Sequence, residues 1–386
     1  MGKRKRSRNR LSSLVGRKSA FKGSGNASLK PQAYLKLGNA YYNLNNNTEA
    51  IKQYQTLLSQ YPNSPEADDA LNNVRSLYVE SGKPDEYASF MRQAGRPISV
   101  STEDSLTWFA AEAQYNNGNS NAALTAFNAY LDKFPEGAYA IDASYYRGEL
   151  SANKKDWKNA LEGYEDVAAS APNRFAEKAI LAAARIYFFE LKNYAKAETY
   201  YGQLNDITSS QEDKLEAMRG LLRTQYQQQK WTEAATSGKE LVAAKGSSSD
   251  DKSLANMAIA KSFQVGGQYD LAIANFKTVV QINKAALGAE ARYEIANCWF
   301  ALRKLQEAEK AAFETIKTSG SYDYWVTKSY ILLGDIYYEQ KDYFNAKATF
   351  QSIVDNSINS ELKTEAQSKL TRVTDEESKS SKVSGQ

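Results

Sequence analysis

The sequence contains no histidine. Histidine is the commonest general base, the usual zinc ligand and the side chain that titrates near neutral pH, so its absence disfavours most hydrolase, metalloenzyme and pH-switch mechanisms. A phosphate-binding loop, a GxSxG motif and a cluster of metal ligands are missing as well. We therefore predict a protein that is not an enzyme and that uses no cofactor and no metal.

Cysteine and long apolar runs are scarce. Because Cys298 is the only cysteine, no intrachain disulfide can form; we interpret it as a small buried apolar residue, with a lone reactive thiol as the alternative. The most apolar stretch, residues 179–191, is interrupted by Arg185 and Glu190. A membrane span needs roughly 18 apolar residues, so the sequence predicts no transmembrane helix.

Acidic residues are absent from the first thirty residues, which contain ten Lys or Arg and leave 39 basic against 45 acidic side chains in the remainder. Six of the ten crowd together: Lys3, Arg4, Lys5, Arg6, Arg8 and Arg10. We predict a basic, disordered arm over residues 1–29. Four interpretations of this arm stay open: contact with nucleic acid or an anionic membrane, a nuclear-import signal, a basic amphipathic segment, or an extension without a role. It lacks the apolar stretch of a secretory signal peptide.

One alanine recurs at nearly constant spacing. After a first gap of 73 residues the spacing is 36–38 residues, and the eight positions are Ala50, Ala123, Ala160, Ala197, Ala234, Ala272, Ala308 and Ala346. When this alanine is numbered 20 in its unit, six of eight units have an aromatic ring at position 24 and six have a small residue at position 8. The pattern predicts pairs of antiparallel helices, with small residues where backbones approach and aromatic rings between neighbouring pairs.

The first unit carries the pattern most completely, in Tyr34, Leu37, Gly38, Tyr41, Ala50, Tyr54 and Pro62. It resembles the tetratricopeptide repeat (TPR). The resemblance implies an all-α fold, a right-handed α-α superhelix of about nine helix pairs with a C-terminal capping helix. Residues 323–337 and 345–353 further resemble the C-terminal repeats of long cell-envelope TPR proteins of Bacteroidetes-type bacteria. Because those proteins usually carry an export signal and many more repeats, this resemblance implies a C-terminal portion and a periplasmic or envelope location.

The predicted domains follow from the units. A solenoid over residues 30–373 follows the arm, with units beginning near residues 31, 67, 104, 141, 178, 215, 253, 289 and 327 and a capping helix over 360–373. The unit near residue 67 lies in the double gap and has lost its small residues, so we interpret it as a degenerate repeat. Residues 374–386 are polar and rich in serine, and we expect them to be disordered.

The resemblance also implies a concave groove, lined by positions 2, 5, 9, 12 and 13 of each first helix, in which partner proteins or peptides bind. Aromatic rings there offer large contact area at low entropic cost. The candidate residues are Tyr42, Trp108, Glu112, Tyr115, Tyr145, Glu149, Phe189, Arg219, Arg223, Tyr226, Lys261, Tyr293, Phe300 and Tyr338. The alternative is that many of these rings pack between adjacent pairs.

The charged candidates change sign along the chain, from Glu112 and Glu149 to Arg223 and Lys261. Such a groove would fix the direction of a charged ligand, whereas a scatter of solvated charges explains the same residues. The carboxylate clamp of chaperone adaptors is absent, because Leu35 stands where its lysine would be. We expect a non-catalytic scaffold, with a basic-arm tether to RNA or an anionic membrane as the alternative function.

Overall fold

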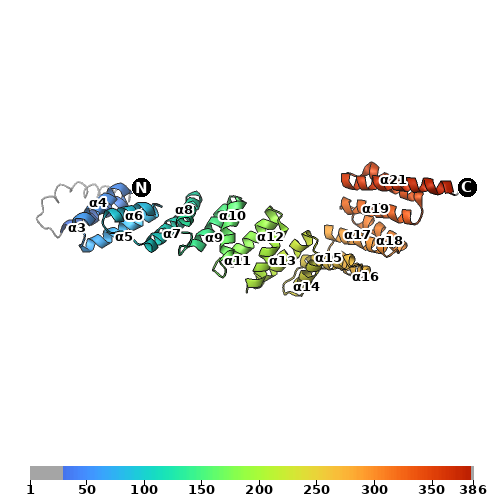
Figure 1. The fold of residues 1–386 in the computed structure, drawn as a ribbon, viewed down its shortest axis with the longest axis horizontal. Helices are drawn as coiled ribbons and strands as arrows, with labels where there is room; N and C mark the ends of the chain where they lie inside the picture. The colour runs from blue at the N-terminus through green and yellow to red at the C-terminus, as the bar shows by residue number, and fades with distance from the viewer. Residues whose placement is uncertain (1–28, 384–386) are drawn as a thin grey trace, which may run out of the picture. The chain divides into compact units, whose positions relative to one another are not determined.

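The structure, a computed structural model, describes residues 29–383, and every regular element in that range is a helix (Figure 1). Nine pairs of helices follow one another and a single helix ends the array. The predicted fold class, an all-helical repeat of about nine pairs with one C-terminal helix, is confirmed. The predicted basic arm, apart from Leu29, lies outside the described residues, as do residues 384–386.

The bounds of the helices follow the repeat. The first helices are α3 (Lys30–Asn43), α5 (Pro65–Glu80), α7 (Val100–Asn116), α9 (Ala140–Asn153), α11 (Ala176–Arg185) with the π-helix η2 (Ile186–Glu190), α13 (Gln211–Gln227), α15 (Ser249–Val265), α17 (Ala286–Ala301) and α19 (Asp323–Glu339). The second helices are α4 (Asn47–Gln60), α6 (Pro84–Gln93), α8 (Ser120–Lys133), α10 (Trp157–Ala169), α12 (Tyr194–Ile207), α14 (Trp231–Ala243), α16 (Tyr269–Ile282), α18 (Leu305–Thr318) and α20 (Tyr343–Asn356). The last helix is α21 (Ser360–Val383).

The chain divides into two compact units, residues 1–179 and 180–386, which are described here separately. Within each unit every helix contacts the next one along the chain, so a second helix lies between the first helix of its own pair and that of the following pair. First helices also contact each other in succession, α3 with α5 and α5 with α7 in the first unit, and α13 through α21 in the second. First helices therefore form a row from α3 to α7 in the first unit and from α13 to α21 in the second.

The turn inside each pair contains one residue with a left-handed backbone. Six of these residues are not glycine, with φ between 53° and 63°: Asn45, Lys155, Lys192, Gln229, Arg303 and Lys341. In the other three pairs glycine occupies the turn, at Gly82, Gly118 and Gly267. Side-chain caps then start several second helices, for example Asp342, whose carboxylate accepts a hydrogen bond from the Asn345 amide. The turn and the cap together set where each second helix begins.

The small residue at position 8 receives the aromatic ring at position 24 of its own pair. A Cβ built on Gly38 would lie 2.3 Å from a ring carbon of Tyr54, and one built on Gly334 would lie 2.5 Å from the ring of Phe350. Both rings are almost completely buried. The small residues were predicted to allow close backbones and the rings to fill spaces between pairs; the structure instead fits ring and glycine together within one pair.

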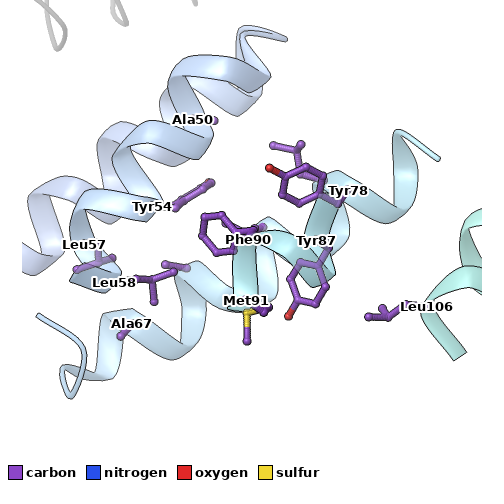
Figure 2. Packing of buried hydrophobic residues seen from close by; sticks show 13 residues of the cluster. Ala50, Tyr54, Leu57, Leu58, Ala67, Tyr78, Tyr87, Phe90, Met91 and Leu106 are labelled. Carbon is purple, nitrogen blue, oxygen red and sulfur yellow. The ribbon is translucent and has the colours of Figure 1, made fainter. Parts of the chain in front are cut away.

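The pair interpreted as degenerate, α5 and α6, is present and lies in an aromatic core (Figure 2). The Tyr78 ring centroid is 6.3 Å from that of Tyr87 and 6.2 Å from that of Phe90. Tyr54 of α4 belongs to the same cluster. Aromatic rings of both helices therefore form the core of this pair, where most other pairs have small residues.

The structure differs from the prediction at the C-terminus, where helix α21 continues to Val383 although residues 374–386 were expected to be disordered. Lys347 of α20 forms an ion pair with Glu377, and Glu376 pairs with Lys379 one turn later. Glutamate and lysine are good helix formers. Together with the Lys347–Glu377 ion pair to α20, they allow the helix to continue beyond its last buried apolar residues.

Candidate protein-binding face

The aromatic candidates at position 12 lie near the C-terminal ends of first helices, with differing exposure. Tyr42 is 37% exposed and Phe189, on the π-helix, is 48% exposed. Tyr115, Tyr226, Phe300 and Tyr338 are half-buried. Only the first two rings therefore present much of their area to solvent.

Two candidates at position 5 are core residues. Trp108 is 2% exposed and stacks on Tyr139 with ring centroids 5.1 Å apart, and Tyr293 is 9% exposed. The half-buried Tyr145 stacks on Phe175 at 4.2 Å. These positions follow the alternative interpretation, in which rings pack between adjacent helices, and they do not form an exposed ladder.

Aromatic candidates of the second unit are partly covered by their neighbours. The Tyr226 hydroxyl donates to Glu290 at 3.4 Å, reaching from α13 to α17. Tyr338 lies under the Arg372 guanidinium of α21, 4.6 Å from the ring centroid. Phe300 packs against the cluster that includes Leu332. The last helix therefore caps the row of first helices in the second unit.

The predicted positive part of the face is largely neutralised. Lys261 lies 2.6 Å from Glu294 and 3.3 Å from Glu290. The Arg219 guanidinium donates from two nitrogens to the Asp251 carboxylate at 2.9–3.0 Å. Arg223 is exposed. Sequence reasoning missed Glu294, which stands at none of the predicted groove positions. A signal existed for the other two partners, since Glu290 stands at position 2 of its unit and Asp251 closes the capping box begun by Ser248.

Glu294 is the centre of a buried polar cluster. It is 6% exposed, and it accepts hydrogen bonds from Lys261 at 2.6 Å, Gln264 at 2.7 Å and Asn297 at 3.1 Å. Burial acts to raise the pKa of this carboxyl, but the Lys261 charge and these hydrogen bonds hold it below its ordinary value. The group is thus a satisfied anion, and the cluster links α15 to α17.

The acidic candidates of the first unit have a different environment. Glu149 accepts a hydrogen bond from the Tyr115 hydroxyl at 3.1 Å, and Glu80 accepts one from Tyr42 at 2.8 Å. Burial first, and then the hydrogen bond to Glu149, raise the pKa of Tyr115 to about 12. Glu112 is half-buried on α7. Tyrosine hydroxyls, and not ammonium or guanidinium groups, approach these carboxylates.

The described residues hold little else that suggests chemistry. Among residues 29–383 no group of three or more potential His, Cys, Asp or Glu ligands could hold a metal ion. Cys298 is fully buried, and burial raises the pKa of its thiol to about 12, as for a small core residue. Over the same range no helix is both long and apolar enough to cross a membrane.

Two family models described as tetratricopeptide repeat match the chain. One covers residues 32–64 and 328–357, and the other covers 110–175 and 257–324. Together the matches span just over half of the 386 residues. No curated protein matches the chain.

Solved structures of low identity share the fold. A tetratricopeptide repeat protein from Parabacteroides merdae is 16% identical, with 69% of this chain and 98% of that chain covered and a TM-score of 0.36. The C-terminal part of a TPR repeat-containing protein from Cytophaga hutchinsonii is 18% identical, with coverages of 64% and 95% and a TM-score of 0.34. Yeast Tom70 is 13% identical, with coverages of 97% and 93% and a TM-score of 0.37.

The repeat is typically a non-catalytic scaffold that binds other proteins or peptides. The family matches fall on helix pairs of both units, and the recurrent alanine and ring occupy equivalent places in them. The chain therefore belongs to the tetratricopeptide-repeat family and is a protein-interaction scaffold in that general sense.

Proposed function

We propose that this chain is a non-catalytic adaptor that binds partner proteins or peptides along the rows of first helices in its two units. The observation that carries the proposal is the placement of Tyr42 and Phe189, two exposed rings at the same repeat position of first helices. Exposed aromatic rings on a rigid helical scaffold are suitable anchors for a peptide or helix. The neighbouring polar groups, such as Glu80, supply direction and specificity.

The test compares two variants of the full chain that lose equal numbers of exposed rings. Tyr42→Ala with Phe189→Ser removes rings from first helices, and Phe313→Ser with Phe344→Ser removes rings from second helices, where they are 48% and 76% exposed. Proteins crosslinked to each variant in native lysate are quantified against the unchanged chain. Loss of the captured proteins from the first variant alone supports the proposal; equal capture by both variants contradicts it.

We further propose, on the family resemblance, that the adaptor works within a bacterial cell-envelope assembly. Fractionation of the source cells tests this, since recovery in the cytoplasmic fraction alone contradicts it. The alternative function is tethering by the basic arm to RNA or an anionic membrane, motivated by the six cationic side chains within residues 3–10. Replacing these six with Ser and measuring binding to RNA and to phosphatidylglycerol vesicles separates the two, since an adaptor without a tether shows no change.

A further inference from the structure

Carboxylates on the first helices differ between the two units in whether they form ion pairs. In the second unit five such carboxylates pair with a Lys or Arg of a neighbouring helix of the row; the pairs are Arg185–Glu216, Arg219–Asp251, Lys261–Glu294, Lys328–Glu365 and Lys369–Asp335. In the first unit, Glu80, Glu112 and Glu149 form no ion pair with any described residue. We call these three the acidic row.

Two members of the acidic row lie beside a group of aromatic rings on α7 and α9. The rings of Tyr115 and Tyr146 have centroids 4.7 Å apart, and those of Tyr145 and Tyr146 are 5.6 Å apart. Glu112 lies one turn before Tyr115 on α7, and Glu149 of α9 accepts a hydrogen bond from the Tyr115 hydroxyl, so both carboxylates lie beside these rings. Burial first, and then the charges of the two carboxylates, raise the pKa of Tyr146. The Tyr145 and Tyr146 rings are themselves stacked on Phe175 and Phe127, so the carboxylates and the tyrosine hydroxyls are the groups that an ammonium or guanidinium group would meet here.

Two arginines of the first unit, Arg147 and Arg174, are engaged with other groups. Arg147 pairs with Glu162 and Asp166 of the second helix of its own pair. Arg174 lies over the Phe175 ring, 4.5 Å from its centroid, and pairs with Asp142. Residues 29–179 contain 14 basic and 19 acidic side chains, whereas residues 180–386 contain 26 of each. Beyond the basic residues 1–28, the excess of acidic side chains therefore lies in residues 29–179, which hold the acidic row.

The complementary charge is present in the same chain. Residues 1–28 carry nine Lys or Arg and no Asp or Glu, and they join directly to the first helix of this unit. Packed helices lie about 10 Å apart, so the three steps from α3 to α9, which carries Glu149, span about 30 Å. A linker from Lys18 to Leu29 can extend to about 35 Å at 3.3 Å per residue, so residues 3–18 can reach the acidic row.

We propose that the acidic row and the tyrosine hydroxyls beside it form a docking surface for a lysine- and arginine-rich segment, and that the occupant is the chain's own residues 3–18. The bound segment covers first helices of the unit, so it competes with a basic partner peptide for the same surface. This consequence for partners rests on the proposed function, whereas the docking itself does not.

Zero-length crosslinking of the full chain tests the docking directly. Carbodiimide joins a lysine to a carboxylate only where the two are in contact, and mass spectrometry then identifies the pair. We expect crosslinks from Lys3, Lys5 or Lys18 to Glu112 or Glu149, which fade as salt is raised because the attraction is screened. Crosslinks that avoid the acidic row overturn the proposal. In a mixture of ¹⁵N-labelled and unlabelled chains, crosslinks that join one label to the other assign the segment to a second copy and overturn the assignment to the same chain.

A matched pair of variants provides an affinity measurement. The chain with Ser at all nine basic positions of residues 1–28 is titrated with a labelled synthetic peptide of residues 1–28. Glu112→Gln with Glu149→Gln, in which the amide oxygen at position 149 can still accept from Tyr115, is expected to weaken binding at least tenfold. Asp132→Asn with Glu136→Gln removes two exposed charges of the same unit away from the row and is expected to leave binding within twofold. An equal loss in both variants points to net charge alone and contradicts a defined surface.

The two proposals fail in distinguishable ways. If the crosslinks form but removal of Tyr42 and Phe189 leaves partner capture unchanged, the docking holds and the adaptor face is wrong. If partner capture is lost with those rings but the crosslinks avoid the acidic row, the adaptor face holds and the docking proposal is wrong.

Discussion

Substitution of Gly334 by alanine tests the fit between ring and glycine that each repeat uses. The added Cβ would lie 2.5 Å from two carbons of the Phe350 ring, which is 1% exposed and cannot swing into solvent. Alanine in a helix interior is favoured over glycine by about 0.5–1 kcal/mol. Overpacking a buried site costs about 1–3 kcal/mol. We therefore expect Gly334→Ala to lower the free energy of unfolding by about 1–2 kcal/mol.

Gly202 supplies the matched control. It lies inside α12, and a Cβ built on it meets nothing within 4 Å. Gly202→Ala should therefore stabilise the chain by about 0.5–1 kcal/mol, since only the helix preference changes. The two substitutions are chemically identical, so the difference between them, about 1–3 kcal/mol, isolates the overpacking at the ring.

Urea denaturation followed by circular dichroism gives the free energies of unfolding. Because repeat arrays unfold in stages when their cooperativity fails, hydrogen exchange of the α19 amides is measured alongside. Shortening the ring in the double variant Gly334→Ala with Phe350→Leu should recover about 1 kcal/mol relative to the sum of the single effects. If Gly334→Ala stabilises the chain as much as Gly202→Ala does, the ring has room to move and the reasoning is refuted.

Three further predictions concern turns, caps and pH. Lys155 has a φ of 59°, so Lys155→Gly should raise the free energy of unfolding by about 0.5–1 kcal/mol in urea denaturation, whereas Lys154→Gly, at a right-handed position, should lower it. Asp342→Ala removes the cap of α20 and should cost about 1 kcal/mol by the same measurement; no loss would show that the cap is replaced by water. Burial raises the pKa of Tyr54 and of Tyr201 to about 12 from the ordinary value of 10.0. The stability that these neutral hydroxyls contribute is complete below pH 10 and is lost as the pH rises through about 12. The difference in absorbance at 295 nm between the unchanged chain and a Tyr54→Phe, Tyr201→Phe variant should therefore show their ionisation together with unfolding; a difference that appears near pH 10 without unfolding would contradict this.

Much of the fold could be predicted from the sequence because repeats carry a local, repeated signal. The recurrent alanine lies in the same place of each pair, and the aromatic residue four positions later is buried, as with Tyr54 and Phe350. The prediction failed at position 5, where Trp108 is buried although the family pattern suggested a groove wall. Sequence spacing fixes which residues share a helix face, but it does not fix how closely the neighbouring helix covers that face.

The sequence by itself determined the pairing of helices, since one pair cannot bury its apolar stripe and the 36–38-residue period forces neighbours to stack. Only the tertiary structure decided which charges remain available. Lys261 and Glu112 hold the same position in their units, yet Lys261 is neutralised by two glutamates of α17, whereas Glu112 forms no ion pair with the described residues. The physical reason is that an ion pair depends on a distance of a few ångströms between residues more than thirty positions apart, which the spacing of one repeat does not specify.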